Sequence, residues 1–195
     1  MKPLFEENFV TRLDKDWIWI HEDPDAWKIA DDALHLRTLP GTLWGDANNA
    51  NNFLLRPVKN FTNGFATRVA VTNEPQLMGE QAGLIWYQDD DNYIKLVKEC
   101  LEGVEWIVLA REEGGQSTLI DKTRISVGSA ELQLVLIEGL AHGQFRSSPE
   151  DEWQLVGKCK LVEGTKPKVG LFSHGGPGEI ERWVTLRGFA LLSDK

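Results

Sequence analysis

Residues 81–110 read QAGLIWYQDDDNYIKLVKECLEGVEWIVLA, and they carry the strongest structural signal in the chain. Its apolar side chains alternate with other residues over three short runs, which is typical of β-strands. Two turn sequences separate the runs: the acidic segment Gln88–Asn92 and the dipeptide Glu102-Gly103. The stretch therefore predicts three consecutive antiparallel strands joined by two hairpins.

The two turns determine which residues lie opposite one another. The first places Tyr87 opposite Tyr93 and Gln81 opposite Glu99, and the second places Glu99 opposite Trp106. Because side chains alternate between the two faces of a sheet, one face is nearly all apolar and is expected to form the core. Its members are Ala82, Leu84, Trp86, Ile94, Leu96, Ile107 and Leu109. We expect the other face to be polar and open to solvent, and it carries Gln81, Tyr87, Tyr93, Lys95, Glu99 and Trp106.

The same pattern continues along the rest of the chain, and helical periodicity is almost absent. A further hairpin turning at Glu138-Gly139 sets Leu132 against Phe145 inside the protein and Gln133 against Gln144 outside. Because one open sheet of this size would leave an apolar face in water, we expect an all-β sandwich of two antiparallel sheets, with 1–195 as a single domain. The expected strands are residues 5–9, 27–30, 33–37, 52–56, 65–71, 82–87, 93–100, 105–111, 117–121, 131–137, 142–147, 154–160, 168–172 and 183–191.

The composition indicates a globular protein that does not bind polyanions. Hydrophobic residues make up 42% of the 195 residues and charged residues 26%, which excludes a disordered or collagen-like chain. With 21 Lys and Arg against 30 Asp and Glu, the formal net charge is −9 at pH 7. This is the wrong sign for binding phosphate backbones or anionic lipid, so we expect neither nucleic acid nor membrane as a partner. The charge and the exposed sheet edges together favour a monomer or a weak homodimer.

The N-terminus and the cysteines indicate a cytoplasmic protein. The first residues, MKPLFEEN, lack the apolar core of a secretory signal, and no apolar run approaches the roughly 18 residues that span a bilayer. Cys100 and Cys159 are isolated in sequence and are expected to be reduced thiols.

Trp106 and its polar neighbours form the main candidate binding site. Its flat ring is expected beside Lys95 and Glu99, with Gln81 across the strand pair, which is the chemistry needed to stack on a sugar face and bind its hydroxyl groups. The alternative is a solvated face with an exposed Lys95–Glu99 ion pair and with Trp106 covered by a loop. Both interpretations remain open at this point, and the second is the more common arrangement.

Other residues are candidates for the same ligand. Tyr93 shares the polar face, Trp19 lies in a run of alternating Trp and Ile, and Arg56 follows an apolar run from which it reaches either a ligand or a nearby carboxylate. For Trp19 packing is the more frequent role, and for Arg56 we favour the structural role. Trp44 is expected to act as an apolar plug in the Asn-rich loop 43–52.

Metal binding and covalent catalysis have weaker support. Asp89–Asp91 lack the spacing of a calcium loop and are expected to form a solvated turn, and the histidines show no zinc spacing. Glu99, Glu102 and Glu105 are three residues apart along a hairpin, which places them on different faces instead of aiming two at one glycosidic bond. His174 lies in an expected glycine-rich loop without a serine or acid partner in sequence. No metal site, cofactor or catalytic residue is therefore predicted.

A set of short segments occurs in a fixed order along the chain. The set is FEENF at 5–9, Trp17, Trp19, Trp27, Leu43-Trp44, EQAGL at 80–84, DNYIK at 91–95, FRSS at 145–148, Trp153 and VGLF at 169–172. Its most specific parts are Gln81-Ala82-Gly83-Leu84 and Tyr93-Ile94-Lys95 with Glu99. Taken together these segments resemble the concanavalin A-like domains, specifically those at the C-terminus of family 43 glycoside hydrolases of the beta-xylosidase type and the related domain of unknown function 1349 family.

The resemblance implies a jelly-roll sandwich that holds ligands in or at the rim of a concave sheet. In family 43 enzymes this domain accompanies a propeller that carries the catalytic carboxylates, and the E-x-D-x-x-E strand of concanavalin-like glucanases does not occur in this sequence. Two alternatives to simple binding remain: a carbohydrate-active enzyme with a site assembled from distant residues such as Glu99 and His174, and a protein-interaction scaffold. We expect a non-catalytic module that binds a glycan or sugar-like small molecule through Trp19, Arg56, Gln81, Tyr93, Lys95, Glu99 and Trp106.

Overall fold

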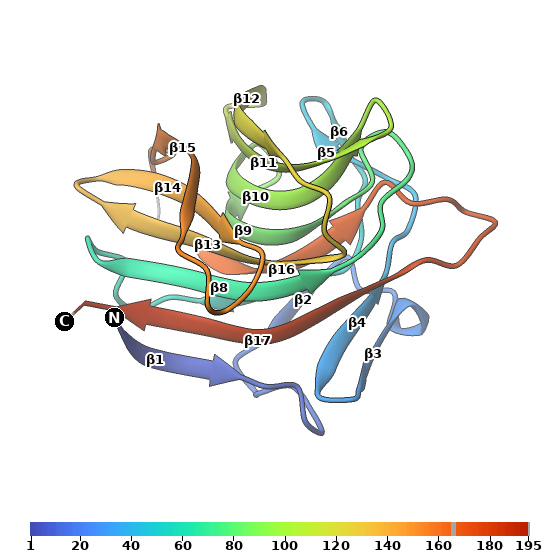
Figure 1. Cartoon of the computed structure of the whole chain (residues 1–195), viewed down its shortest axis with the longest axis horizontal. Coiled ribbons are helices and arrows are strands. Elements are labelled where there is room, and N and C mark those ends of the chain that lie inside the picture. The colour runs from blue at the N-terminus through green and yellow to red at the C-terminus, as the bar shows by residue number, and fades with distance from the viewer. Residues whose placement is uncertain (165–166, 195) are drawn as a thin grey trace.

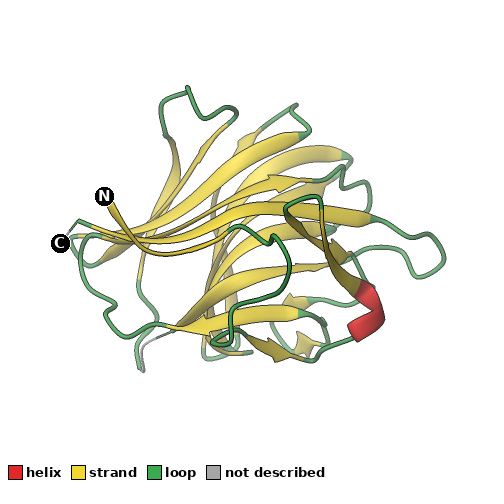
Figure 2. Cartoon of the chain, turned by 90° about the horizontal axis from the view of Figure 1, so that it is seen from below, coloured by secondary structure: helices red, strands yellow, loops and turns green. Residues whose placement is uncertain are grey.

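The computed structural model describes residues 1–164 and 167–194 and confirms the all-β sandwich. Two large antiparallel sheets, one of eight strands and one of seven, stack on one another (Figure 1). Within the described residues, helix is limited to one 3-10 turn at Pro24–Ala26, drawn red in Figure 2. No helix in this part of the chain has the length and apolar character needed to cross a membrane.

The eight-stranded sheet combines strands from both ends of the chain. Its order is β15-β14-β13-β8-β17-β4-β3, and β1 pairs with the second half of β17. At the end of that pairing the amino group of Met1 lies 3.9 Å from the Asp194 carboxylate. The strands are β1 (Lys2–Glu7), β3 (Trp27–Ala30), β4 (Ala33–Arg37), β8 (Phe65–Thr72), β13 (Ser129–Ile137), β14 (Leu140–Arg146), β15 (Gln154–Lys160) and β17 (Trp183–Ser193).

The seven-stranded sheet contains residues 81–110. Its order is β12-β11-β10-β9-β16-β7-β2. A separate two-stranded hairpin, β5 and β6, lies near the β9–β10 turn and the β11–β12 turn (Figure 1). The strands of the sheet are β2 (Ile18–Ile20), β7 (Phe53–Pro57), β9 (Gln81–Asp89), β10 (Asn92–Leu101), β11 (Val104–Glu113), β12 (Gln116–Arg124) and β16 (Lys168–His174). Those of the hairpin are β5 (Leu43–Trp44) and β6 (Ala47–Asn48).

The predicted register of the hairpins is confirmed. Tyr93 pairs with Tyr87, Glu99 pairs with both Gln81 and Trp106, and the Glu138-Gly139 hairpin has the expected pairs. At the turn between β10 and β11, Glu102 and Gly103 both have positive φ, 53° and 74°. Two consecutive residues of this conformation give the turn whose twist matches that of the flanking strands.

The core lies between the two sheets and is built from the face predicted to be apolar. Ala82, Leu84 and Leu96 are fully buried there, and Trp86 donates from its indole N–H to the Thr67 hydroxyl at 3.0 Å. Close approach of neighbouring strands requires glycine at position 83, because a Cβ there would lie 2.3 Å from the Leu96 carbonyl oxygen.

The prediction that the other face of β9, β10 and β11 is open to solvent is wrong. Residues 38–52, which we call the covering segment and which include β5 and β6, pack over this face. Leu43 is the plug in place of the predicted Trp44: Leu43 is 1% exposed and joins a second apolar cluster, whereas Trp44 is 41% exposed. Lys95 and Tyr93, expected on a solvated surface, are therefore buried.

Three short strands were not predicted, and one loop begins later than expected. β2, β5 and β6 contain only two or three residues each, too few for an alternation to show.

β16 extends to His174, so this histidine lies in the seven-stranded sheet and the glycine-rich loop starts after it. The extension places His174 directly opposite Gln81.

Candidate functional site

A cavity of about 350 Å³ opens over one end of β9 and β10, on the outer face of the seven-stranded sheet. We call it the groove pocket. Three of the residues lining it, Gln81, Lys95 and Glu99, are polar and buried, and we call them the polar floor. Three others, Trp44, Met78 and Leu119, are apolar and exposed, and we call them the apolar rim.

Strand register brings the polar floor together. Gln81 at the start of β9 lies opposite Glu99 near the end of β10, and Lys95 is on the same face as Glu99, four residues earlier. The Gln81 amide nitrogen donates to Glu99 Oε1 at 3.0 Å and to the carbonyl oxygen of Gly79 at 3.1 Å. Its amide oxygen is buried without a hydrogen-bond partner among the described residues. Gln81 therefore keeps one acceptor free beside the cavity.

Lys95 is a buried cation with few partners. Its side-chain nitrogen donates to the Leu43 carbonyl oxygen at 3.0 Å and lies 5.1 Å from the centre of the Trp44 ring. An ammonium group has three N–H donors, so this one bond leaves donor capacity unused. Burial lowers the pKa of Lys95 to about 8, and the carboxylates of Glu99 and Glu112 oppose that shift. The exposed Lys95–Glu99 ion pair considered above does not form: no ion pair within 4.0 Å joins the two in the described structure.

Glu99 completes the polar floor. It is 8% exposed, and burial raises the pKa of its carboxyl group, while Lys95 and Lys122 oppose the rise. One carboxylate oxygen accepts the bond from Gln81. The floor thus holds a donor-rich amine, a carboxyl group and a free amide oxygen within one small area.

His174 lies next to the polar floor and was not predicted as part of it. It sits opposite Gln81 on β16, so Gln81 lies between His174 and Glu99 in the sheet. The ring is 2% exposed, and neither nitrogen has a partner with hydrogen-bond geometry among the described residues. Burial holds the pKa of His174 well below its ordinary value, Lys95 lowers it further, and the Gly41 backbone opposes the shift. The imidazole is therefore neutral.

Tyr93 anchors the covering segment and has no exposed ring face for stacking. It is 0% exposed, and its hydroxyl lies 2.8 Å from the Leu43 carbonyl oxygen and 2.7 Å from Glu112 Oε2. Burial, with the hydrogen bond to Glu112, raises the pKa of Tyr93 far above its usual range. The same Glu112 oxygen accepts from the Gly45 N–H at 3.0 Å and from the Ser117 hydroxyl at 2.5 Å. These bonds fix the turn between β5 and β6.

Trp106 lies near the polar floor but does not line the groove pocket. Its ring is partly buried against the second apolar cluster, and the Lys122 side-chain nitrogen lies 4.3 Å from the ring centre. Its indole nitrogen is buried and has no hydrogen-bond partner in the part of the chain that the structure describes. Of the two interpretations weighed for Trp106, the structure favours a covered ring.

The structure does not bring Trp19 and Arg56 to the pocket. Trp19 packs toward the core between the sheets, with its ring 4.9 Å from that of Trp27. Arg56 forms ion pairs with Asp14 at 2.6 Å and Asp16 at 3.0 Å, and its guanidinium lies 3.7 Å from the centre of the Phe5 ring. Arg56 therefore has the structural role that the sequence favoured.

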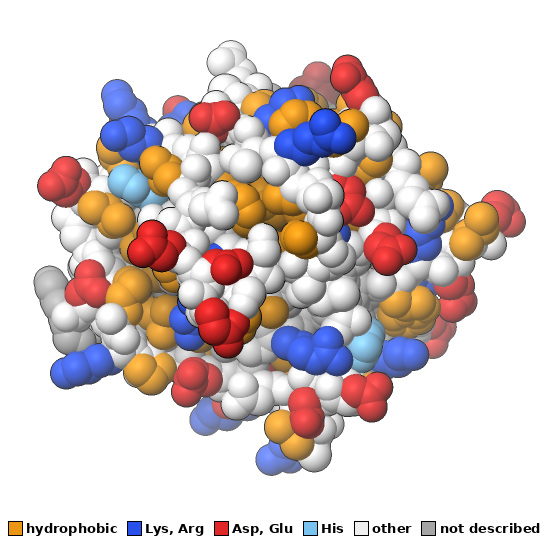
Figure 3. All heavy atoms as spheres, in the orientation of Figure 1, with side chains coloured by type: hydrophobic (Ala, Val, Ile, Leu, Met, Phe, Trp, Pro, Cys, Tyr) orange, Lys and Arg blue, Asp and Glu red, His pale blue; other side chains and the backbone are white. Residues whose placement is uncertain are grey.

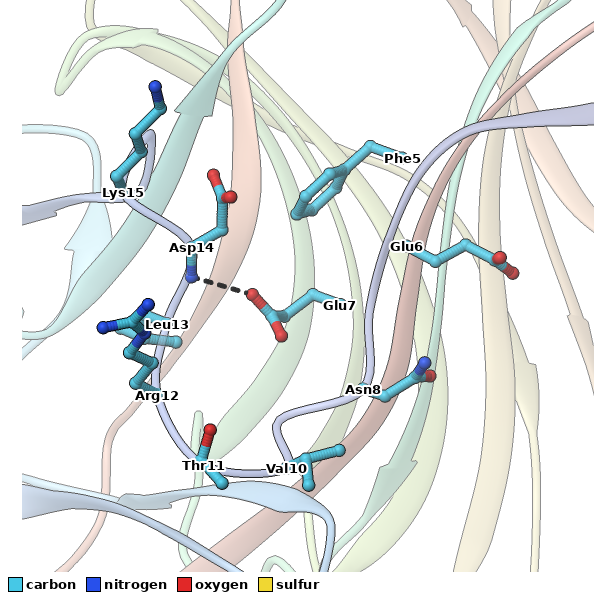
Figure 4. A pocket seen from close by; sticks show the side chains of 10 residues that line it. All are labelled: Phe5, Glu6, Glu7, Asn8, Val10, Thr11, Arg12, Leu13, Asp14 and Lys15. Atoms are coloured by element: carbon cyan, nitrogen blue, oxygen red, sulfur yellow. Dashed lines mark hydrogen bonds between the residues drawn. The ribbon is translucent and has the colours of Figure 1, made fainter.

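A wider cavity of about 670 Å³ lies against the segment Phe5–Lys15 (Figure 4). Glu7 points into this loop and accepts hydrogen bonds from the backbone N–H groups of Phe9 and Asp14 and from the indole of Trp17. Since these bonds use both carboxylate oxygens, Glu7 holds the loop in place, and we assign no ligand to this cavity.

Acidic side chains are not gathered as a metal site. Asp89 accepts from the backbone N–H of Asp91 at 3.0 Å and from the Asn92 amide at 2.8 Å, so its Oδ1 is used within the turn. Within the described ranges, no group of three His, Cys, Asp or Glu side chains is arranged to hold a metal ion. Figure 3 shows acidic and basic side chains interspersed over the face it presents.

Comparison with known proteins gives one family match. Residues 5–168 match the family described as the beta xylosidase C-terminal concanavalin A-like domain. Among curated protein sequences no significant match is found.

Solved structures of similar fold include proteins much longer than this chain and one of similar length. The GH43 protein BlXynB from Bacillus licheniformis superposes with a TM-score of 0.84 at 19% identity, over 96% of this chain and 39% of that one. Xylan beta-1,4-xylosidase from Bacillus halodurans gives 0.80 at 18% identity, over 96% and 39%. A functionally unknown protein from Saccharomyces cerevisiae gives 0.74 at 18% identity, over 92% and 97%. The chain thus spans about two fifths of the two Bacillus proteins and nearly all of the yeast protein.

Proposed function

Because this chain belongs to the family of beta-xylosidase C-terminal concanavalin A-like domains, which are associated with carbohydrate-active enzymes, we propose that it binds a neutral sugar in the groove pocket. The observation that carries the proposal is the set of unused hydrogen-bonding groups at the polar floor. Lys95 has spare donors, and Gln81 has a free acceptor.

Unused buried polar groups are costly, so their concentration beside a cavity favours a ligand that completes them. Each buried group without a partner costs about 1–3 kcal/mol relative to its hydrated state. A ligand whose own donors and acceptors match these groups would supply the missing hydrogen bonds. Gln81 and Lys95 line the same cavity, so one ligand would serve both.

The mixture of donors and acceptors selects hydroxyl groups. A hydroxyl donates one hydrogen bond and accepts others, so it is able to satisfy both Lys95 and the amide oxygen of Gln81. A phosphate or carboxylate only accepts, and it would place its charge beside the carboxyl group of Glu99. A polyol is therefore the better chemical match than an anion.

The volume of the groove pocket and the similar solved structures limit the range of sugars that we propose as ligands. A cavity of about 350 Å³ is at the small end of ligand sites, which suits one or two sugar rings. One of the similar structures is a xylan beta-1,4-xylosidase, and this supports a pentose such as xylose as the ligand. Binding of this kind needs no catalytic group in the chain.

Isothermal titration calorimetry tests the proposal. We expect D-xylose and methyl β-D-xylopyranoside to bind the wild-type protein, and Gln81→Leu to abolish the binding because the variant lacks the amide that bridges the floor. Gln133→Leu is the matched control: Gln133 is also a buried glutamine on an outer sheet face, bonded to Gln144 at 3.1 Å, but it lies on β13 of the other sheet. The control should bind sugar as the wild type does.

Two results would count against the proposal. One is the absence of any binding heat with the wild-type protein at millimolar sugar. The other is a Gln81→Leu variant that is folded, as judged by its melting temperature, and binds as tightly as the wild type.

A further inference from the structure

The apolar rim is unusual because its members are large, exposed and gathered at one cavity. Trp44 is 41% exposed, Met78 69% and Leu119 42%. They come from β5, the loop before β9, and β12, three parts of the chain distant in sequence. Single exposed apolar residues are normal on protein surfaces, whereas several around one opening mark an interaction site.

Two members of the rim are held in position by their surroundings. The turn that follows Trp44 is fixed by the bonds from the Gly45 N–H to Glu112 and to the Ser117 hydroxyl at 3.0 and 2.7 Å. The Met78 sulfur accepts from the backbone N–H of Glu102 at 3.4 Å, which ties the side chain to the β10–β11 turn. The rim is therefore a prearranged apolar surface, which reduces the entropy that a ligand loses on binding.

The rim and the polar floor face the same space but suit different parts of a ligand. The floor offers several hydrogen-bonding groups, whereas the indole, the thioether and the leucine side chain at the mouth present mainly apolar surface. An indole face and a methionine sulfur both pack well against an aromatic ring.

We propose, building on the sugar site above, that the ligand is a sugar with an aromatic substituent, which packs on Trp44, Met78 and Leu119 while the sugar hydroxyls reach the polar floor. The ligand class is thus an aryl glycoside or an aromatic ester of a sugar. On binding, the aromatic substituent would be transferred from water to the apolar rim, and it would cover rim side chains that are exposed to solvent in the free protein.

Titration of two glycosides that differ only in the substituent tests this inference. Phenyl β-D-xylopyranoside should bind the wild-type protein about tenfold more tightly than methyl β-D-xylopyranoside, the size expected for an aromatic contact with added apolar burial. Met78→Ser and Leu119→Ser should bring the phenyl glycoside close to the affinity of the methyl glycoside and leave the methyl glycoside unchanged. Leu155→Ser, an exposed leucine of β15 in the other sheet, is the control and should change neither.

The outcomes separate this inference from the proposed function. Equal affinities of the two glycosides, both lost in Gln81→Leu, would overturn the aromatic substituent and support the sugar site. Failure of both glycosides to bind would overturn the sugar site and the substituent with it. A preference for the phenyl glycoside that survives both rim substitutions would place the aromatic contact elsewhere and overturn the role of the rim.

Discussion

Replacing Lys95 by methionine should remove a pH dependence of stability that the buried amine supplies. Burial lowers the pKa of Lys95 from 10.5 to about 8 in the folded protein. Between these two values the unfolded chain holds a proton that the folded chain has released. Stability therefore rises with pH across the window from about 8 to 10.5, and below about 8 this group contributes no pH dependence.

The magnitude follows from the size of the shift. The pKa of Lys95 differs by about 2.5 between the unfolded and folded states, which corresponds to about 3 kcal/mol in the free energy of unfolding over the whole window. Between pH 7.5 and 9.5 the same linkage gives about 2 kcal/mol. Lys95→Met keeps the length of the side chain and removes the ionisable group, so the variant lacks this contribution.

Urea unfolding at pH 7.5 and 9.5 measures the effect. The free energy of unfolding of the wild type, minus that of Lys95→Met, should increase by about 2 kcal/mol between the two pH values. Other groups that titrate at high pH, such as Cys159, are present in both proteins and cancel in the difference. Lys158→Met removes an exposed lysine and should show no such increase. A difference that stays constant with pH would refute the burial of Lys95 beneath the covering segment.

Three further substitutions test the fold around the site. Leu43→Ala removes the plug of the covering segment and should cost about 2–5 kcal/mol in urea unfolding. Gly83→Ala should lower the melting temperature strongly, since its Cβ would lie 2.3 Å from a backbone oxygen, whereas Gly128→Ala, with open space around it, should leave the melting temperature nearly unchanged. Arg56→Met breaks two ion pairs with partly exposed aspartates, so it should cost about 1 kcal/mol or less and leave sugar affinity unchanged in calorimetry.

The strand register was predictable because its signals are local. The Glu102-Gly103 turn and the alternation on either side of it are contained within residues 92–113, and period two leaves only one register with an apolar core face. The same reasoning placed Gln81 opposite Glu99 and so found two of the three residues of the polar floor as a pair, with Lys95 on the same face.

The environment of those residues was not predictable from the same signals. The bond from Lys95 to Leu43 joins positions 52 residues apart, and alternation along a strand carries no information about which distant loop covers it. The Asn-rich sequence of residues 43–52 indicated a loop, but not where that loop lies. The expectation that Trp44 is the buried plug was also wrong. It rested on the larger apolar surface of tryptophan, whereas the backbone of the two-residue strand decides that Leu43 points inward.

The covering segment has a consequence for how a polysaccharide would be recognised. In an open jelly roll, a long chain is able to lie along the sheet and contact many strands at once. Here Leu43 and its neighbours cover part of that surface, and the groove pocket opens over one end of β9 and β10. A polymer would then be held by its terminal unit, so the number of binding equivalents in a sample would depend on how many chain ends it contains and not on its mass.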